Sequence, residues 1–86
     1  MPQPIRDARS LGEVLRAARV ARGWTQARLA EAAGMQQHHV SNVENGLKDV
    51  KLTTLIALAV ALDLDLALIP RRAPSPAGTD DIRDIF

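Results

Sequence analysis

Apolar side chains recur every three or four residues near the start of the chain, over residues 11–22. That spacing places them on one face of a helix and predicts a first helix over this range. Ser10 and Glu13 have the spacing of a capping box, in which each side chain bonds the backbone N–H of the other residue. Gly23 is expected to end the helix in a left-handed conformation. The apolar positions are Leu11, Val14, Leu15 and Ala18.

Two shorter apolar patterns follow, and a glycine separates them. Thr25 is a suitable N-cap for a helix over 26–33, and Gly34 supplies a turn before a helix over 37–45, which Asn45-Gly46 ends. Two short helices joined by a tight turn are typical of the helix-turn-helix motif. The positions expected to face the core are Leu29, Ala30, Ala33, Met35, Val40 and Val43.

The last apolar segments are too apolar for one small chain to cover. After an N-cap at Thr53, a helix over 54–62 is apolar on all sides, whereas a small domain buries one stripe. From Leu64 to Ile69 the period changes to two, which predicts a β-strand ended by Pro70. A lone strand leaves its backbone unpaired. We therefore expect an all-α fold of four to five short helices with one C-terminal β-strand, which pairs with a second copy in an intermolecular two-stranded sheet.

Length and charge divide the chain into three parts. With 86 residues it holds one small domain over 10–70, between a flexible N-terminal arm over 1–9 and a disordered acidic tail over 71–86. The net charge of +1 hides an excess of +3 in residues 1–51 and of −2 in residues 73–86. A basic body suits nucleic-acid contact, although a solvated surface of mixed charge explains it equally well. Asp63 and Asp65 interrupt the longest apolar stretch, so we expect a cytoplasmic protein rather than a membrane span.

Four polar side chains share one face of the helix expected over 37–45. They are Gln37, His38, Ser41 and Asn42. Amide, hydroxyl and imidazole groups are those that read base edges in the major groove of DNA. The alternative interpretation is a solvated polar face on a helix-turn-helix module used for protein interaction.

Metal binding and catalysis have weaker support. His38 and His39 point about 100° apart on a helix, and the chain has no cysteine to complete a metal site with them. Ser41 lies within a turn of His38, but no carboxylate is placed to orient the imidazole. We therefore expect neither an enzyme nor a metal or other cofactor.

The spacing of these elements over 11–62 resembles the Cro/C1 or XRE-type helix-turn-helix regulators of bacteria, which have a lambda-repressor-like fold. The segment 52–55 with the alternating strand behind it resembles the HipB-type antitoxins, which dimerise through a two-stranded sheet. The resemblance implies a repressor that binds a palindromic operator, autoregulates its operon and binds a HipA-like kinase toxin. A stand-alone regulator of the same family is the alternative. The matching residues are Leu15, Arg19, Gly23, Thr25-Gln26, Leu29-Ala30, Gly34, Val40-Ser41 and Val43-Glu44-Asn45-Gly46.

The resemblance also implies roles for individual residues. Gln37 and His38 occupy the main base-reading positions, with Ser41 and Asn42 beside them. Arg19 and Glu44 are expected to form a structural ion pair. The residues expected on DNA phosphates are Gln26, Gln36, His39, Lys48 and Lys51. Those expected in the dimer interface are Leu58, Leu64, Leu66, Leu68 and Ile69.

Overall fold

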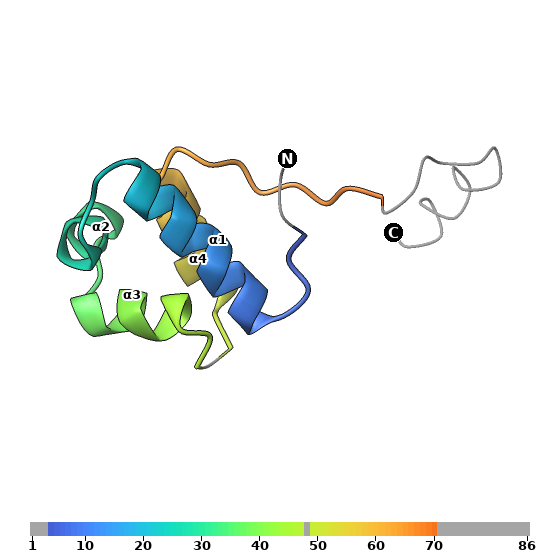
Figure 1. The fold of residues 1–86 in the computed structure, drawn as a ribbon, viewed down its shortest axis with the longest axis horizontal. Coiled ribbons are helices and arrows are strands. Elements are labelled where there is room, and N and C mark those ends of the chain that lie inside the picture. The colour runs from blue at the N-terminus through green and yellow to red at the C-terminus, as the bar shows by residue number, and fades with distance from the viewer. Residues whose placement is uncertain (1–3, 48, 71–86) are drawn as a thin grey trace, which may run out of the picture.

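Helices make up most of the part of the chain that the computed structural model describes, residues 4–47 and 49–70. The four helices within it are α1 (Ala8–Ala21), α2 (Gln26–Ala33), α3 (Gln37–Glu44) and α4 (Leu52–Ala61). In Figure 1, α3 runs along the lower edge of the molecule, while α1 crosses above it and lies in front of α4. The tail expected over 71–86 lies outside the described residues.

The core lies where the apolar stripes of the helices meet. Leu29, Val40 and Leu58 are the largest side chains with almost no exposed surface, and they come from α2, α3 and α4. Leu11 and Leu15 of α1 complete this cluster. The inward positions expected from the periodicity of the first three helices are confirmed for Leu11, Leu15, Leu29, Ala30, Val40 and Val43, and Ala33 and Met35 pack against the cluster from its margin.

The first helix begins three residues earlier than expected, inside the expected N-terminal arm. Asp7 is its N-cap and accepts a hydrogen bond from the Ser10 backbone N–H at 2.8 Å, which lowers the pKa of this carboxyl. The Ser10 hydroxyl in turn accepts from the Asp7 N–H at 3.1 Å. A capping box is therefore present, but Ser10 is its third helical residue rather than its cap, and Glu13 instead pairs with Arg9.

Of the two other N-caps expected from the sequence, one is present and one is not. Thr25 caps α2 as expected, because its hydroxyl accepts from the Arg28 N–H at 3.0 Å. The expectation of a cap at Thr53 is wrong, since α4 begins at Leu52 after Lys51, which makes no side-chain cap bond. The Leu55 N–H donates to Lys51 O at 3.0 Å, so the first turn of α4 includes both threonines.

Each described helix ends in the same hydrogen-bonded turn around one left-handed residue. Gly23, Gly34 and Gly46 have φ near +70°, and Asp63 takes the equivalent place after α4 with φ 57°. At that end the Asp63 N–H donates to Val60 O at 3.0 Å, and the Leu64 N–H donates to Ala59 O at 2.8 Å. This pair of hydrogen bonds is the Schellman motif, which satisfies the last free carbonyls of a helix.

Gly12 lets α1 and α3 cross closely. A Cβ atom built on Gly12 would lie within 2.5 Å of Glu44 O and closer still to Val43 O. The end of α3 therefore presses directly on the backbone of α1. A second tie joins α4 to the start of the helix-turn-helix, because Arg22 Nη1 donates to Leu62 O at 3.2 Å.

Beyond Asp63 the chain leaves the helices in an extended conformation, as the orange segment of Figure 1 shows. Residues 64–70 form no strand with other described residues. Leu66, Leu68 and Ile69 are exposed. The intermolecular sheet expected for this segment stays a prediction.

One face of α4 is likewise open to solvent. Its outer stripe is formed by Leu52, Ile56 and Val60, all exposed. Leu58, expected in the dimer interface, is instead 1% exposed and belongs to the core of its own chain, because it lies on the opposite side of the helix. The expectation that Leu58 lies in a dimer interface is therefore wrong.

Candidate nucleic-acid interface

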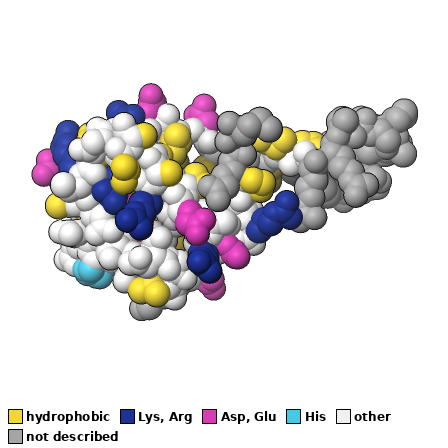
Figure 2. All heavy atoms as spheres, viewed as in Figure 1, with side chains coloured by type: hydrophobic (Ala, Val, Ile, Leu, Met, Phe, Trp, Pro, Cys, Tyr) yellow, Lys and Arg dark blue, Asp and Glu magenta, His cyan; other side chains and the backbone are white. Residues whose placement is uncertain are grey.

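The recognition face, which we define as Gln37, His38, Ser41 and Asn42, lies on the outward side of α3. Val40 and Val43 are buried, and Gln37 and His38 are exposed. Ser41 and Asn42 are partly exposed. The structure therefore presents all four side chains that the sequence placed together. Their helix, α3, lies along the lower edge of Figure 1, and Figure 2 shows a histidine at the surface on that side.

The polar side chains in and beside the recognition face make different contacts along α3. Gln36, the N-cap of α3, makes no cap bond with its side chain, so its amide is available to an outside partner. The rings of His38 and His39 lie with their centroids 4.3 Å apart, tilted by 32°. At the far end, Asn45 Nδ2 donates to the Ser41 hydroxyl at 3.4 Å.

A buried charged network behind α3 fixes its position. Glu44 Oε2 accepts from Arg19 Nε at 2.7 Å, and Glu44 Oε1 accepts from Arg19 Nη2 at 3.1 Å. Gln26 Nε2 donates to the same Oε1 at 3.1 Å, and Arg19 Nη1 donates to Trp24 O at 2.6 Å. Arg19 and Glu44 thus lie together as the resemblance implies. Because the network joins α1, α2 and α3, the recognition face is held on a rigid base.

Gln26 has a contact that sequence reasoning missed. Its side-chain amide faces Glu44, 18 residues away, rather than the solvent. No local pattern signals such a pair. With its side chain bonded to Glu44, Gln26 can meet a phosphate through its backbone N–H at the N-terminal end of α2.

A groove of about 340 Å³ runs beside the recognition face. His38, His39 and Asn42 line it from α3, and Lys51 and Thr54 line it from the start of α4. The structure therefore gathers two expected base-reading residues and two expected phosphate contacts around one hollow. Lys48 lies outside the described residues.

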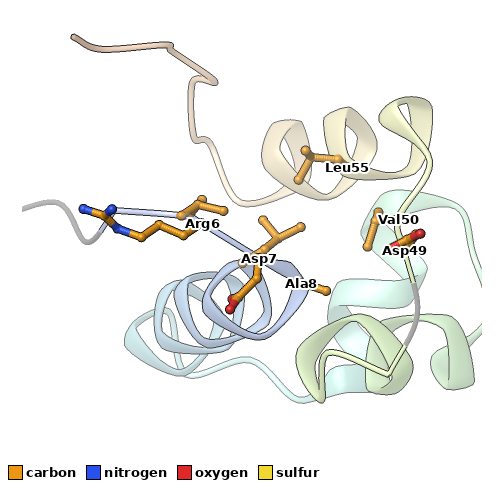
Figure 3. Close-up of a pocket in the computed structure, with 8 residues that line it drawn as sticks. Arg6, Asp7, Ala8, Asp49, Val50 and Leu55 are labelled. Carbon is orange, nitrogen blue, oxygen red and sulfur yellow. The ribbon is translucent and has the colours of Figure 1, made fainter. Parts of the chain in front are cut away.

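A larger hollow of about 420 Å³ lies between the start of α1 and the segment before α4. Ile5, Leu11, Val50 and Leu55 give it an apolar lining. Figure 3 shows Leu55 and Val50 on the opposite side of this hollow from Asp7 and Ala8. Arg6, Asp7 and Asp49 are the charged residues of its lining.

Residues 4–47 and 49–70 hold neither a candidate metal site nor a candidate membrane-spanning helix. No group of three His, Asp or Glu side chains there could hold a metal ion. None of the helices in the same residues is long and apolar enough to cross a membrane.

A model of the helix-turn-helix domain matches residues 10–71. Antitoxin HipB of Escherichia coli (strain K12) is 32% identical over 78 residues, which are 91% of this chain and 89% of that protein. The match therefore spans the recognition face, α4 and the extended segment behind it.

Two solved structures show how far the fold is shared. The structure of a HipA-HipB-O2-O3 complex matches with a TM-score of 0.74 and 31% identity, covering 83% of this chain and 100% of that chain. The restriction-modification controller protein C.AhdI of Aeromonas hydrophila matches with a TM-score of 0.66 and 36% identity, covering 67% of this chain and 88% of that chain.

Proposed function

The chain belongs to the family of helix-turn-helix domains, and on that premise we propose that it is a sequence-specific repressor that binds double-stranded DNA as a homodimer. We further propose that it serves as the HipB-like antitoxin of a toxin–antitoxin system. In that role it represses its own operon and binds a HipA-like kinase toxin. The likeness to antitoxin HipB over most of both chains supports this subclass.

The observation that carries the proposal is the rigidly mounted polar face of α3. Gln37 and Asn42 carry amides that can bond adenine N6 and N7 as a pair, each pair being worth roughly 1–3 kcal/mol of discrimination. Because the Glu44 network holds α3 from behind, the amides need no ordering of the helix when DNA binds. His38 and Ser41 supply further donors and acceptors beside them.

The phosphate contacts surround this face. Lys51 and His39 border the groove beside α3, and the N-terminal end of α2 points a helix dipole at an incoming phosphate. Such contacts set the register of the protein on the duplex and leave base reading to α3. The residues assigned to phosphates are Gln26, Gln36, His39, Lys48 and Lys51.

The proposed DNA-binding unit needs a second copy of the chain. The outer stripe of α4 and the exposed Leu64–Ile69 segment are apolar surfaces that a twofold partner would cover. Two recognition helices in a symmetric dimer read a palindrome, with half-sites about one helical turn or a multiple apart. Dimerisation therefore gives the specificity that one short helix lacks.

Titration of the purified chain with selected and random duplexes at several salt concentrations tests the DNA-binding proposal. Affinity should fall linearly on a log–log plot with salt, since bound phosphates release counterions. Gln37→Ala should weaken binding to the selected site roughly 5- to 150-fold, which corresponds to the loss of the two hydrogen bonds between one side chain and one base. Binding to random DNA and the thermal midpoint should not change. No salt-dependent binding at all would leave a protein-interaction module as the function.

A pull-down from the native host tests the antitoxin assignment separately. The full chain should retain a kinase-like protein, and a chain ending at residue 70 shows whether residues 71–86 are needed. A chain that binds DNA specifically but retains no kinase would favour a stand-alone regulator. Its likeness to a restriction-modification controller protein makes that the second candidate.

A further inference from the structure

The four helix ends offer a comparison that singles out one residue. In each Schellman turn, the residue after the left-handed one donates its N–H to a carbonyl five residues back. All four of these residues are apolar: Trp24, Met35, Leu47 and Leu64. An apolar residue at this place usually packs on an apolar side chain in the last turn of its own helix.

Two of the four pack on the core, and a third follows a last turn that holds buried apolar residues. Met35 follows a last turn that holds the buried Leu29 and Ala30, and it packs on the core. Leu64 follows a last turn that holds the buried Leu58 and Ala59. Trp24 packs on the core as well, beside the partly buried Ala18.

Leu47 differs from the other three. Its N–H donates to Asn42 O at 3.1 Å, so its backbone is fixed against the last turn of α3. The two residues it would pack on there are Ser41 and Asn42, both polar and both on the recognition face. Leu47 is accordingly 65% exposed. A Cβ atom built on Gly46 would lie 2.8 Å from Arg9 Cα, so the turn before Leu47 already lies against the start of α1.

The place of Leu47 in the fold indicates what its apolar partner is. Leu47 follows the end of α3, and its N–H is bonded to the carbonyl of Asn42, which belongs to the recognition face. Leu47 therefore lies next to the residues proposed to read bases. The apolar group that the major groove displays beside base edges is the C5-methyl group of thymine.

We propose that Leu47 is a specificity-determining residue that packs on the C5-methyl group of a pyrimidine next to the base contacted by Asn42. The inference rests on the proposed DNA binding by α3 and adds a position to its code. It predicts a thymine preference in each half-site that no hydrogen bond explains, and 5-methylcytosine would present the same methyl group.

Removal of one methyl group from DNA tests the inference without altering the protein. Sites are first selected from a random duplex pool with the full chain, and each thymine is then replaced by deoxyuridine, one symmetric pair at a time. At one pair, binding should weaken by about fourfold per half-site, the effect of one buried methyl group. Leu47→Ala should bind the thymine site more weakly and show no difference between thymine and deoxyuridine there.

Val20→Ala is the matched control, because Val20 is similarly exposed but lies on α1. It should keep the full thymine preference, and both variants should keep the wild-type thermal midpoint. If wild type and Leu47→Ala lose the same factor on deoxyuridine, or if no thymine matters to wild type, the assignment of Leu47 is overturned while DNA binding stands. If the wild-type chain selects no sites, the proposed function itself fails.

Discussion

Glu44 and Arg19 are joined by two hydrogen bonds of 2.7 and 3.1 Å across 25 residues of sequence, and the Glu44 side chain is 2% exposed. A carboxylate this buried is tolerable because Arg19 neutralises it and Gln26 satisfies a remaining lone pair. Truncation of one partner leaves the other charge buried. The pair therefore matters for stability mainly because loss of either partner would leave an uncompensated charge in the interior.

Glu44→Ala should accordingly lower the free energy of unfolding by about 3–5 kcal/mol, the range for a broken buried ion pair. Urea denaturation followed by circular dichroism measures it. Glu31→Ala is the control, because Glu31 pairs with Arg28 at the surface and should cost well under 1 kcal/mol by its loss. Equal effects of the two substitutions would contradict a structural role for the buried pair.

Gly12→Ala should destabilise the protein although alanine favours helices. Its methyl group would collide with Val43 O and Glu44 O, and relief requires α1 and α3 to separate. Overpacking of this kind costs about 1–3 kcal/mol, beyond the roughly 1 kcal/mol gained in helix propensity. Ala17→Gly, at an exposed site of the same helix, gives the propensity effect for comparison. A stabilised Gly12→Ala variant would show that the crossing is looser than described.

Asp63→Gly should raise the thermal midpoint. Asp63 has φ 57°, where a side chain costs about 1–2 kcal/mol, whereas glycine adopts this conformation freely. Part of that gain is lost to the extra freedom of glycine in the unfolded chain, so we expect about 1 kcal/mol, or several degrees for a domain this small. Gly34→Ala is the converse control, because its added Cβ meets nothing within 4 Å and tests the strain by itself. Unchanged midpoints in both would remove strain as the explanation.

The proposed sheet between copies should pair symmetrically about Leu66. That register places Leu64 opposite Leu68 of the second copy and Asp65 opposite Ala67. A register centred on Asp65 would oppose two like charges, and one centred on Ala67 would place Leu64 opposite proline, which has no N–H to donate.

Because the chain has no cysteine, Leu66→Cys supplies a unique thiol for this test. Under mild oxidation it should give a covalent dimer on a non-reducing gel, with Asp65→Cys and Ala67→Cys markedly less reactive. Preferred cross-linking at residue 67 would shift the register by one. A monomer by light scattering would contradict the sheet altogether.

The sequence predicted the parts of the fold that depend on local pattern. The helix around Val40 and Val43 was predictable because its apolar spacing and its Asn45-Gly46 end agree. The start of α4 was not, since Thr53 is a good cap by type, yet the helix begins at Leu52 after Lys51, which makes no side-chain cap bond. Leu58 was misplaced because an all-apolar helix gives no contrast from which to tell its inner side.

The candidate site also has features that the sequence predicted and features that it did not. Gln37, His38, Ser41 and Asn42 were found because helical spacing alone puts them on one face. The bond between Gln26 and Glu44, and the exposure of Leu47, depend on how three helices meet. No local pattern contains that information.

The turn at Asp63 sets the direction in which the Leu64–Ile69 segment leaves α4, and Arg22 anchors the carbonyl just before it. If two copies join through that segment, this one turn determines how far apart their recognition helices stand. Half-site spacing on DNA would then be encoded 16 residues of sequence beyond Leu47, the last residue proposed to contact a base. A change in the turn could alter which operators fit without touching the residues that read them.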